Sequence, residues 1–69
     1  MRNNIKLKCV NIPLKNGYTH GSWNIGFIYN AYEGWYDADA GETEMRIYDN
    51  NNICCRFRDY SWEKYFKEV

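Results

Sequence analysis

The chain has 69 residues, which is enough for one domain, residues 1–69, with a thin hydrophobic core. Aromatic residues make up 19% of the sequence, and rings of this size can stabilise a small core without disulfides or a metal. The formal net charge is zero, which argues against a dedicated nucleic-acid-binding protein, because such proteins usually carry a basic excess.

The first predicted element is a strand over Ile5–Val10, where apolar and basic residues alternate. A period of two places Ile5, Leu7 and Cys9 toward the core and the lysines between them in water. The following segment, Asn11–Ser22, contains the only proline and two glycines. We therefore predict a long loop there.

The longest apolar-rich stretch, Trp23–Asp37, contains many aromatic and β-branched residues, which favours a strand over a helix. Its two faces are predicted to carry Phe27, Tyr29 and Ala31 on one side and Ile28, Asn30 and Tyr32 on the other. Gly34 interrupts the pattern and predicts a bulge that redirects Trp35 and Tyr36. A polar turn is predicted to follow over Asp37–Gly41.

The segments Thr43–Asp49 and Ile53–Phe57 are predicted to form a β-hairpin around Asn50–Asn52, because asparagine tolerates the positive φ of tight turns. The three-residue loop sets a register that directs the apolar side chains of both strands to one face. The residues predicted to point inward are Met45, Ile47, Ile53, Cys55 and Phe57.

The C-terminal segment is predicted to form one 3-10 or helical turn over Asp59–Lys64, followed by a short strand over Tyr65–Val69. Taken together, these patterns predict a mostly β, antiparallel domain. We expect its strands to curl into a small barrel, because closure removes the exposed edges of a sheet.

Several strings of residues, namely GFIYNAY, MRIYDNNN, ICCRF and DYSWEKYFKEV, follow the basic first strand in an order that resembles a group of small, mostly uncharacterised phage and prophage proteins. The residues that carry the resemblance are Lys6, Lys8, Cys9, Gly26, Tyr29, Ile47, Asp49, Phe57, Tyr65, Phe66 and Val69. The resemblance implies a five-stranded SH3-like barrel and a phage setting, where such proteins often bind and block host factors. It names no catalytic residue and no cofactor. The sequence departs from the group at Phe27, where lysine is common, and at Asn52, where glycine usually ends the hairpin.

The outer face of the predicted hairpin is rich in arginine, since the register places Arg46 opposite Arg56 and Glu44 opposite Arg58. Like charges across a strand pair repel each other, so a carboxylate or an anionic ligand is needed to offset them. One hypothesis is an anion- or nucleotide-binding surface in which the arginines hold phosphate and a tyrosine stacks on a base. Its residues are Arg46, Tyr48, Arg56 and Arg58. The alternative is that Glu44, Asp59 or the acidic turn neutralises the arginines within the fold.

A second candidate surface is the aromatic and acidic segment around the predicted bulge. Adjacent strand residues point in opposite directions, so Trp35 and Tyr36 cannot both enter the core without a bulge. An exposed aromatic ring beside carboxylates is a common anchor for binding another protein. The predicted protein-binding residues are Tyr32, Trp35, Tyr36, Asp37 and Asp39. The alternative is that the bulge allows both rings to pack over the end of the barrel.

No motif in the sequence points to catalysis. The soft ligands Cys9, Cys54 and His20 match no zinc spacing, and no glycine-rich phosphate loop occurs. The acidic residues between 33 and 44 are predicted to lie around a turn rather than in a cleft. We therefore expect a protein that is not an enzyme and that uses no metal and no cofactor.

Three cysteines, two of them adjacent, indicate free thiols in a reducing compartment. No segment resembles a signal peptide or a membrane span, so we expect a soluble protein in the cytoplasm, that of the host cell if it is phage-encoded. The leading hypothesis is binding and inhibition of a host protein, in host takeover or anti-defence. The alternatives are binding of a nucleic acid or nucleotide signal, and a structural role with a symmetric homodimer as the default.

Overall fold

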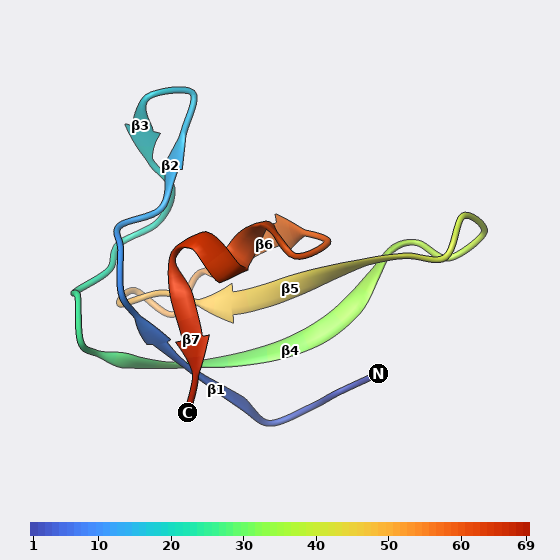
Figure 1. The fold of residues 1–69 in the computed structure, drawn as a ribbon, viewed down its shortest axis with the longest axis horizontal. Helices are drawn as coiled ribbons and strands as arrows, with labels where there is room; N and C mark the ends of the chain where they lie inside the picture. Colours follow the sequence, from blue (N-terminus) through green and yellow to red (C-terminus); the bar gives the residue numbers. More distant parts are fainter.

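The computed structural model describes all 69 residues, which fold mainly into β-strands (Figure 1). The elements, in chain order, are β1 (Ile5–Cys9), β2 (Leu14–Lys15), β3 (Tyr18–Thr19), β4 (Ile28–Asp37), β5 (Glu42–Tyr48), β6 (Cys54–Arg58), the 3-10 turn η1 (Ser61–Lys64) and β7 (Phe66–Glu68). The structure contains no helix that is both long and apolar enough to cross a membrane.

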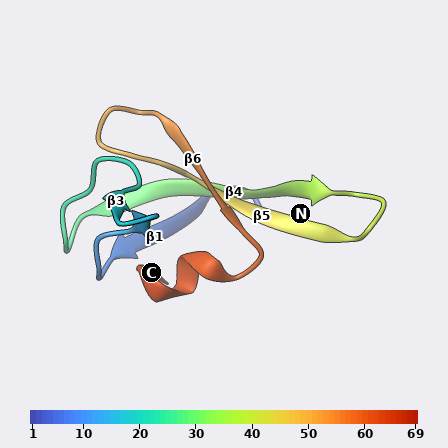
Figure 2. The ribbon, with the colours of Figure 1, turned by 90° about the horizontal axis from the view of Figure 1, so that it is seen from above.

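One antiparallel sheet of five strands forms most of the molecule, in the order β6-β5-β4-β1-β7. The edge strands β6 and β7 do not pair with each other, so no ladder closes the sheet into the predicted barrel. The element between them is η1, which contacts both β6 and β7 (Figure 2). A 3-10 turn forms hydrogen bonds within itself and offers no strand-like ladder, which explains why the sheet stays open at this position.

The sheet and the loop before β4 enclose one hydrophobic core. The buried hydrophobic residues are Ile5, Leu7, Cys9, Trp23, Tyr29, Ala31, Met45, Ile47, Cys55, Phe57 and Phe66. Trp23 packs edge-on against Tyr29 and Phe66, with ring centroids 4.9 and 5.0 Å away. Such edge-to-face contacts add to the free energy gained by burying apolar area. The core therefore depends on aromatic rings, as the composition indicates.

The first and last strands of the chain agree with the prediction. β1 alternates buried and exposed residues, with Ile5, Leu7 and Cys9 inside and the two lysines outside. Near the C-terminus, η1 precedes the short strand β7, whose Phe66 is almost completely buried. β7 pairs with β1, so the last strand returns beside the first one.

The segment Asn11–Ser22, predicted as a loop, contains the small hairpin β2–β3. Its turn is Asn16-Gly17, with φ values of 53° and 82°. Two successive positive φ values define the type I′ turn, which favours Asn-Gly and matches the twist of a two-stranded hairpin. The sequence therefore contained a hairpin signal that the loop prediction missed. In Figure 1 this hairpin stands apart from the five-stranded sheet.

The strand predicted over Trp23–Asp37 begins later, at Ile28. A turn precedes it, in which Gly26 has a φ of 92° and its N–H donates to the carbonyl of Cys9 (2.7 Å). Because of this turn, Phe27 is 58% exposed and does not share the inner face with Tyr29, contrary to the prediction. The apolar run from Trp23 to Asp37 is long enough for one strand, but the turn at Gly26 divides it.

The β5–β6 hairpin has the predicted register. Met45 lies opposite Phe57 and Ile47 opposite Cys55, and all four side chains are buried. Glu44 lies opposite Arg58, Arg46 opposite Arg56, and Tyr48 opposite Cys54. The pattern of alternating apolar residues therefore fixed both the pairing and the face.

Asp49 organises the turn of this hairpin. Its Oδ1 accepts hydrogen bonds from the N–H groups of Asn51 and Ile53, both at 2.9 Å. Burial alone would raise the pKa of Asp49, but these donors and the N–H of Ser22 outweigh it and lower that pKa. Ile53 belongs to this turn and is 58% exposed, so its predicted inward orientation is wrong. Asn52 takes the positive φ, 59°, that its residue type permits.

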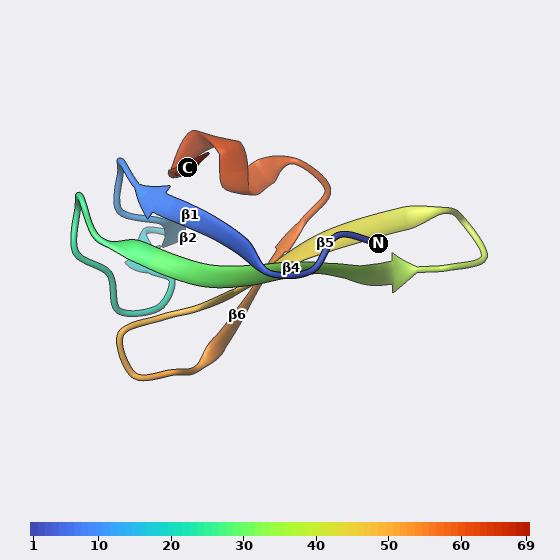
Figure 3. The same cartoon turned by 90° about the horizontal axis from the view of Figure 1, so that it is seen from below.

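The ends of β4 and β5 extend beyond the core as a twisted arm, which we define as residues 34–44. Figures 1 and 3 show it projecting from the body of the molecule in both views. Beneath it the N-terminal segment is held by Arg2, which forms ion pairs with Glu33 and Glu68. The arm positions the aromatic and acidic residues considered next.

Candidate functional site

A buried carboxylate lies at the centre of the arginine face of the sheet. Glu44 is only 1% exposed, and its carboxylate lies between Arg46 and Arg56. Arg56 donates from Nε to Oε2 (2.5 Å) and from Nη2 to Oε1 (2.7 Å), while Arg46 donates from Nε to Oε2 (2.8 Å). The like charges that the register places opposite each other are therefore offset within the fold.

The space for this arrangement comes from Gly34, the cross-strand partner of Glu44. A Cβ at Gly34 would lie 2.5 Å from Cζ of Arg46, closer than real carbon contacts allow. The missing side chain lets the guanidinium of Arg46 lie over the β4 backbone, where Nη2 donates to the carbonyl of Trp35 (3.3 Å). β4 does contain an irregularity of the predicted kind, but not at Gly34: the register shifts between Trp35 and Asp37.

The two arginines mainly change the ionisation of Glu44. The hydrogen bond from Arg56, the largest influence, lowers the pKa of Glu44 to about 2, against the opposing effect of burial. The same contact raises the pKa of Arg56, and the hydrogen bond to Glu44 raises that of Arg46. The group is thus fully ionised at neutral pH, with two positive charges and one negative charge.

Arg58 is held in a different way at the end of β6. It forms an ion pair with Glu42 and a longer one with Asp59 (3.9 Å). Its guanidinium carbon also lies 4.2 Å from the centroid of the Tyr36 ring, which is the geometry of a cation–π contact. All of these groups are largely solvent-exposed, so each contact contributes little stability.

Two tyrosines complete this face on the other side of Glu44. The rings of Tyr32 and Tyr48 lie 6.1 Å apart, and Arg46 lies 5.5 Å from the Tyr32 centroid. The hydrogen bond with Tyr32 raises the pKa of Tyr48. The structure therefore places Tyr32, predicted for the aromatic surface, beside the arginines instead.

The remaining aromatic and acidic residues lie on the arm. Trp35 and Tyr36 are 50% and 48% exposed, so neither ring packs into the core. Asp37 caps the turn, because its Oδ1 accepts hydrogen bonds from the N–H groups of Asp39 (3.1 Å) and Ala40 (3.3 Å). Neither Asp37 nor Asp39 forms an ion pair.

The two predicted surfaces are thus regrouped by the fold. Tyr32 and Tyr36 join the arginine face, while Trp35 lies on the opposite face of β4, across from Thr43. Alternation along β4 explains this grouping, because Tyr32, Gly34 and Tyr36 share one face and Trp35 lies on the other, before the register shifts. The prediction grouped these residues differently because it placed a bulge at Gly34.

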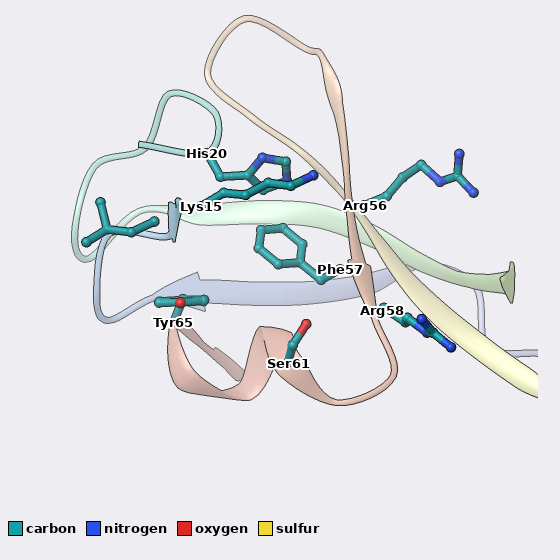
Figure 4. Close-up of a pocket in the computed structure, with 8 residues that line it drawn as sticks. Lys15, His20, Arg56, Phe57, Arg58, Ser61 and Tyr65 are labelled. Atoms are coloured by element: carbon teal, nitrogen blue, oxygen red, sulfur yellow. The ribbon is translucent and has the colours of Figure 1, made fainter. Parts of the chain in front are cut away.

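A pocket that the sequence analysis did not predict lies between the β2–β3 hairpin, β6 and η1 (Figure 4). Its volume is about 260 Å³. The residues that line it are Leu14, Lys15, His20, Arg56, Phe57, Arg58, Ser61 and Tyr65. Figure 4 shows Phe57 pointing between His20 and Tyr65, whereas Arg56 and Arg58 point to the other side of β6. The Asn16-Gly17 turn was the signal that could have located this hairpin.

The adjacent cysteines diverge, with Cys54 exposed and Cys55 buried, and burial raises the pKa of the Cys55 thiol to about 11. A buried thiol with a raised pKa is a poor nucleophile at neutral pH. No cluster of three or more potential metal ligands is present. Comparison with protein families, curated proteins and solved structures finds no significant match to this chain.

Proposed function

We propose that this chain is a non-enzymatic binding domain that engages and inhibits another protein, a host protein in the phage setting that the sequence resemblance implies. The observation that carries the proposal is the arm, which holds Trp35 half-exposed on the strand that leads into the turn of Asp37 and Asp39, two residues without an ion-pair partner. A buried aromatic ring stabilises the fold. An aromatic ring outside the core, on a pair of strands that projects from the molecule, is instead well placed to contact a partner.

The strand order supports an SH3-like class for this domain. The last strand returns beside the first, and a 3-10 turn separates it from the β5–β6 hairpin, as the resemblance leads one to expect. In this proposal the sheet curls into a partly closed barrel, and the gap between β6 and β7 is its open side. A fold of this size serves as a rigid scaffold for loops and hairpins rather than as a container for a catalytic cleft.

The test is affinity purification from host cells with three versions of the protein: the native chain, Trp35→Ala, and Tyr18→Ala as a matched control. Tyr18 is 79% exposed and lies on the separate β2–β3 hairpin, so its loss removes a surface aromatic without touching the proposed contact. We expect a partner that is retained by the native chain and by Tyr18→Ala, and lost with Trp35→Ala. All three should have similar melting temperatures.

Two outcomes would count against the arm. A Trp35→Ala protein that unfolds would assign the ring a structural role, and a partner retained by every variant would place the contact elsewhere. Asp39→Asn distinguishes the acidic contribution, because removing an exposed charge should slow association without changing stability.

A second proposal concerns the arginine face, where nucleic acid or a nucleotide signal is the alternative ligand. Arg46 and Arg56 share one carboxylate, which leaves one positive charge beside the Tyr32–Tyr48 pair. Each arginine nevertheless has an internal partner, so this alternative has weaker support. It requires salt-sensitive binding that is weakened in Arg56→Glu. Absence of binding to DNA, RNA and cyclic nucleotides at low salt would eliminate it.

A further inference from the structure

β6 has hydrogen-bonding groups without a partner along its outer side. It is the last strand of the sheet and pairs with β5 alone. At the two ends of their ladder, Asp49 donates to the carbonyl of Ile53 (3.0 Å) and Asp59 donates to that of Thr43 (2.9 Å). In an antiparallel pair the bonded residues alternate, so the residues that bond toward β5 between these ends are Cys55 and Phe57.

The same alternation directs the N–H and C=O groups of Cys54, Arg56 and Arg58 away from β5. The β2–β3 hairpin belongs to a separate sheet and does not pair with them. All three residues have exposed side chains. The open edge therefore offers the donors and acceptors that an additional strand needs.

Basic side chains lie along this edge, and one of them, Lys15, has no acidic partner. Three adjoining hollows along β6 all include Lys15 and Arg56 among their lining residues, with Asp49 in one of them and Glu44 in another. No carboxylate lines the pocket of about 260 Å³ beside Phe57, although Lys15, His20, Arg56 and Arg58 all contribute to it. Lys15 is exposed and forms no ion pair in the fold. Its ammonium group is therefore available to an incoming acidic group.

We propose that the β6 edge binds an extended, acidic segment of a partner protein by strand addition. Main-chain hydrogen bonds to Cys54, Arg56 and Arg58 supply affinity, and side chains at alternate positions supply specificity. Acidic residues of the added strand lie on the outer face near Arg56 and Arg58. The residues between them point to the opposite face, where Phe57 and Tyr65 border the pocket.

Charge also decides against a second copy of this chain as the occupant. A symmetric pairing of β6 with β6 would bring Arg56 and Arg58 of one copy against the same residues of the other. Like charges in adjacent strands repel, which is a common way for edge strands to avoid self-association. The same charges favour a strand rich in glutamate or aspartate.

This surface adjoins the base of the arm but does not include Trp35, Asp37 or Asp39, so the inference does not depend on the function proposed for Trp35. A partner could contact either surface alone. The experiments use different variants, which makes failure of one proposal distinguishable from failure of the other.

The first experiment measures amide hydrogen exchange by NMR in the free protein. We expect the amides of Cys55 and Phe57 to exchange slowly and those of Cys54, Arg56 and Arg58 to exchange fast. Slow exchange at all five amides would show that the edge is already covered, and would overturn the proposal.

The second experiment titrates the labelled protein with a short peptide that alternates glutamate and valine. We expect saturable shifts at Cys54, Arg56 and Arg58, slower exchange of their amides, and binding that weakens at high salt. Two control peptides separate the main-chain hydrogen bonds from the charge interaction. The first has alternate backbone nitrogens methylated, and the second has lysine in place of glutamate. Both should fail to bind.

The matched protein variants are Lys15→Glu and Lys67→Glu, which reverse the same charge near β6 and on the opposite edge strand β7. Lys15→Glu should weaken peptide binding at least about fivefold, whereas Lys67→Glu should change it less than about twofold. Equal binding of the methylated peptide, equal shifts with single-stranded DNA, or shifts confined to the arm would contradict strand addition. Absence of saturable shifts at millimolar peptide would do so as well.

Discussion

The two faces of the β5–β6 hairpin are formed by alternate residues of the same two strands, but different interactions stabilise them. The inner face carries Ile47 and Phe57, which are buried against other apolar groups, so its contribution does not depend on pH or salt. The outer face carries Glu44 between two arginines, so its contribution depends on the ionisation of one carboxylate. The comparison shows that a buried charge can be kept on the solvent side of a thin sheet when a glycine opposite it provides the space.

The largest effect is expected from the inner face. Ile47→Ala removes a completely buried side chain from the core and should lower the free energy of unfolding by about 3–4 kcal/mol. Ile53→Ala is the matched control in the same hairpin, because that side chain is more than half exposed, and it should cost less than about 1 kcal/mol. Urea unfolding monitored by tryptophan fluorescence measures both. Equal losses would mean that the two faces do not differ in burial.

The next effect is expected at Glu44. Its pKa of about 2 lies below the ordinary value of 4.5, so its stabilising contribution is complete above pH 5 and is lost as the pH falls toward 2. Glu44→Gln should therefore lower the free energy of unfolding by about 2 kcal/mol at pH 7. The difference from the native chain should nearly disappear at pH 2.

Urea unfolding of both proteins across pH 2–7 provides the measurement, and Glu33→Gln is a suitable control because the ion-pair partner of Glu33 is the exposed Arg2. A constant difference between Glu44→Gln and the native chain at every pH would show that packing, rather than charge, explains the loss.

The smallest effect is expected at Gly34. A Cβ there would meet the end of the Arg46 side chain, which can move aside, so Gly34→Ala should cost about 1 kcal/mol rather than prevent folding. The displaced Arg46 should leave Glu44 with Arg56 as its main partner, and the pKa of Glu44, measured by NMR titration, should rise. An unchanged pKa of Glu44 would show that Arg46 still contacts Glu44 from a different side-chain conformation.

Local pattern was sufficient for much of the fold. The alternation in β1, the register of the β5–β6 hairpin and the turn before β7 all followed from spacing, because neighbouring residues on a strand must face opposite sides. The prediction failed where the backbone changed direction: at Gly26, which delays β4, and at Asn16-Gly17, which forms β2–β3. A turn depends on φ values that several residue types permit, so composition indicates it less reliably.

In the candidate sites, too, some features were predictable from the sequence and others depended on the tertiary structure. The opposition of Arg46 and Arg56 was predictable from register, but the 1% exposure of Glu44 was not, because it depends on the empty space above Gly34. By contrast, the position of Tyr36 on the face of Arg58 follows from its alternation with Tyr32 and Gly34, and only its close contact with Arg58 needed the tertiary structure. Contacts across strands require coordinates whenever a register shifts.

The sequence by itself determined that this is a mostly β domain with an aromatic core and one charged hairpin face, because alternation and residue volume leave few other ways to bury these side chains. Only the tertiary structure decided that η1 separates β6 from β7, that Trp35 is held outside the core, and that the edge of β6 is open beside Lys15. These features arise from segments far apart in the chain. Their relative positions depend on the packing of the whole molecule rather than on any local pattern.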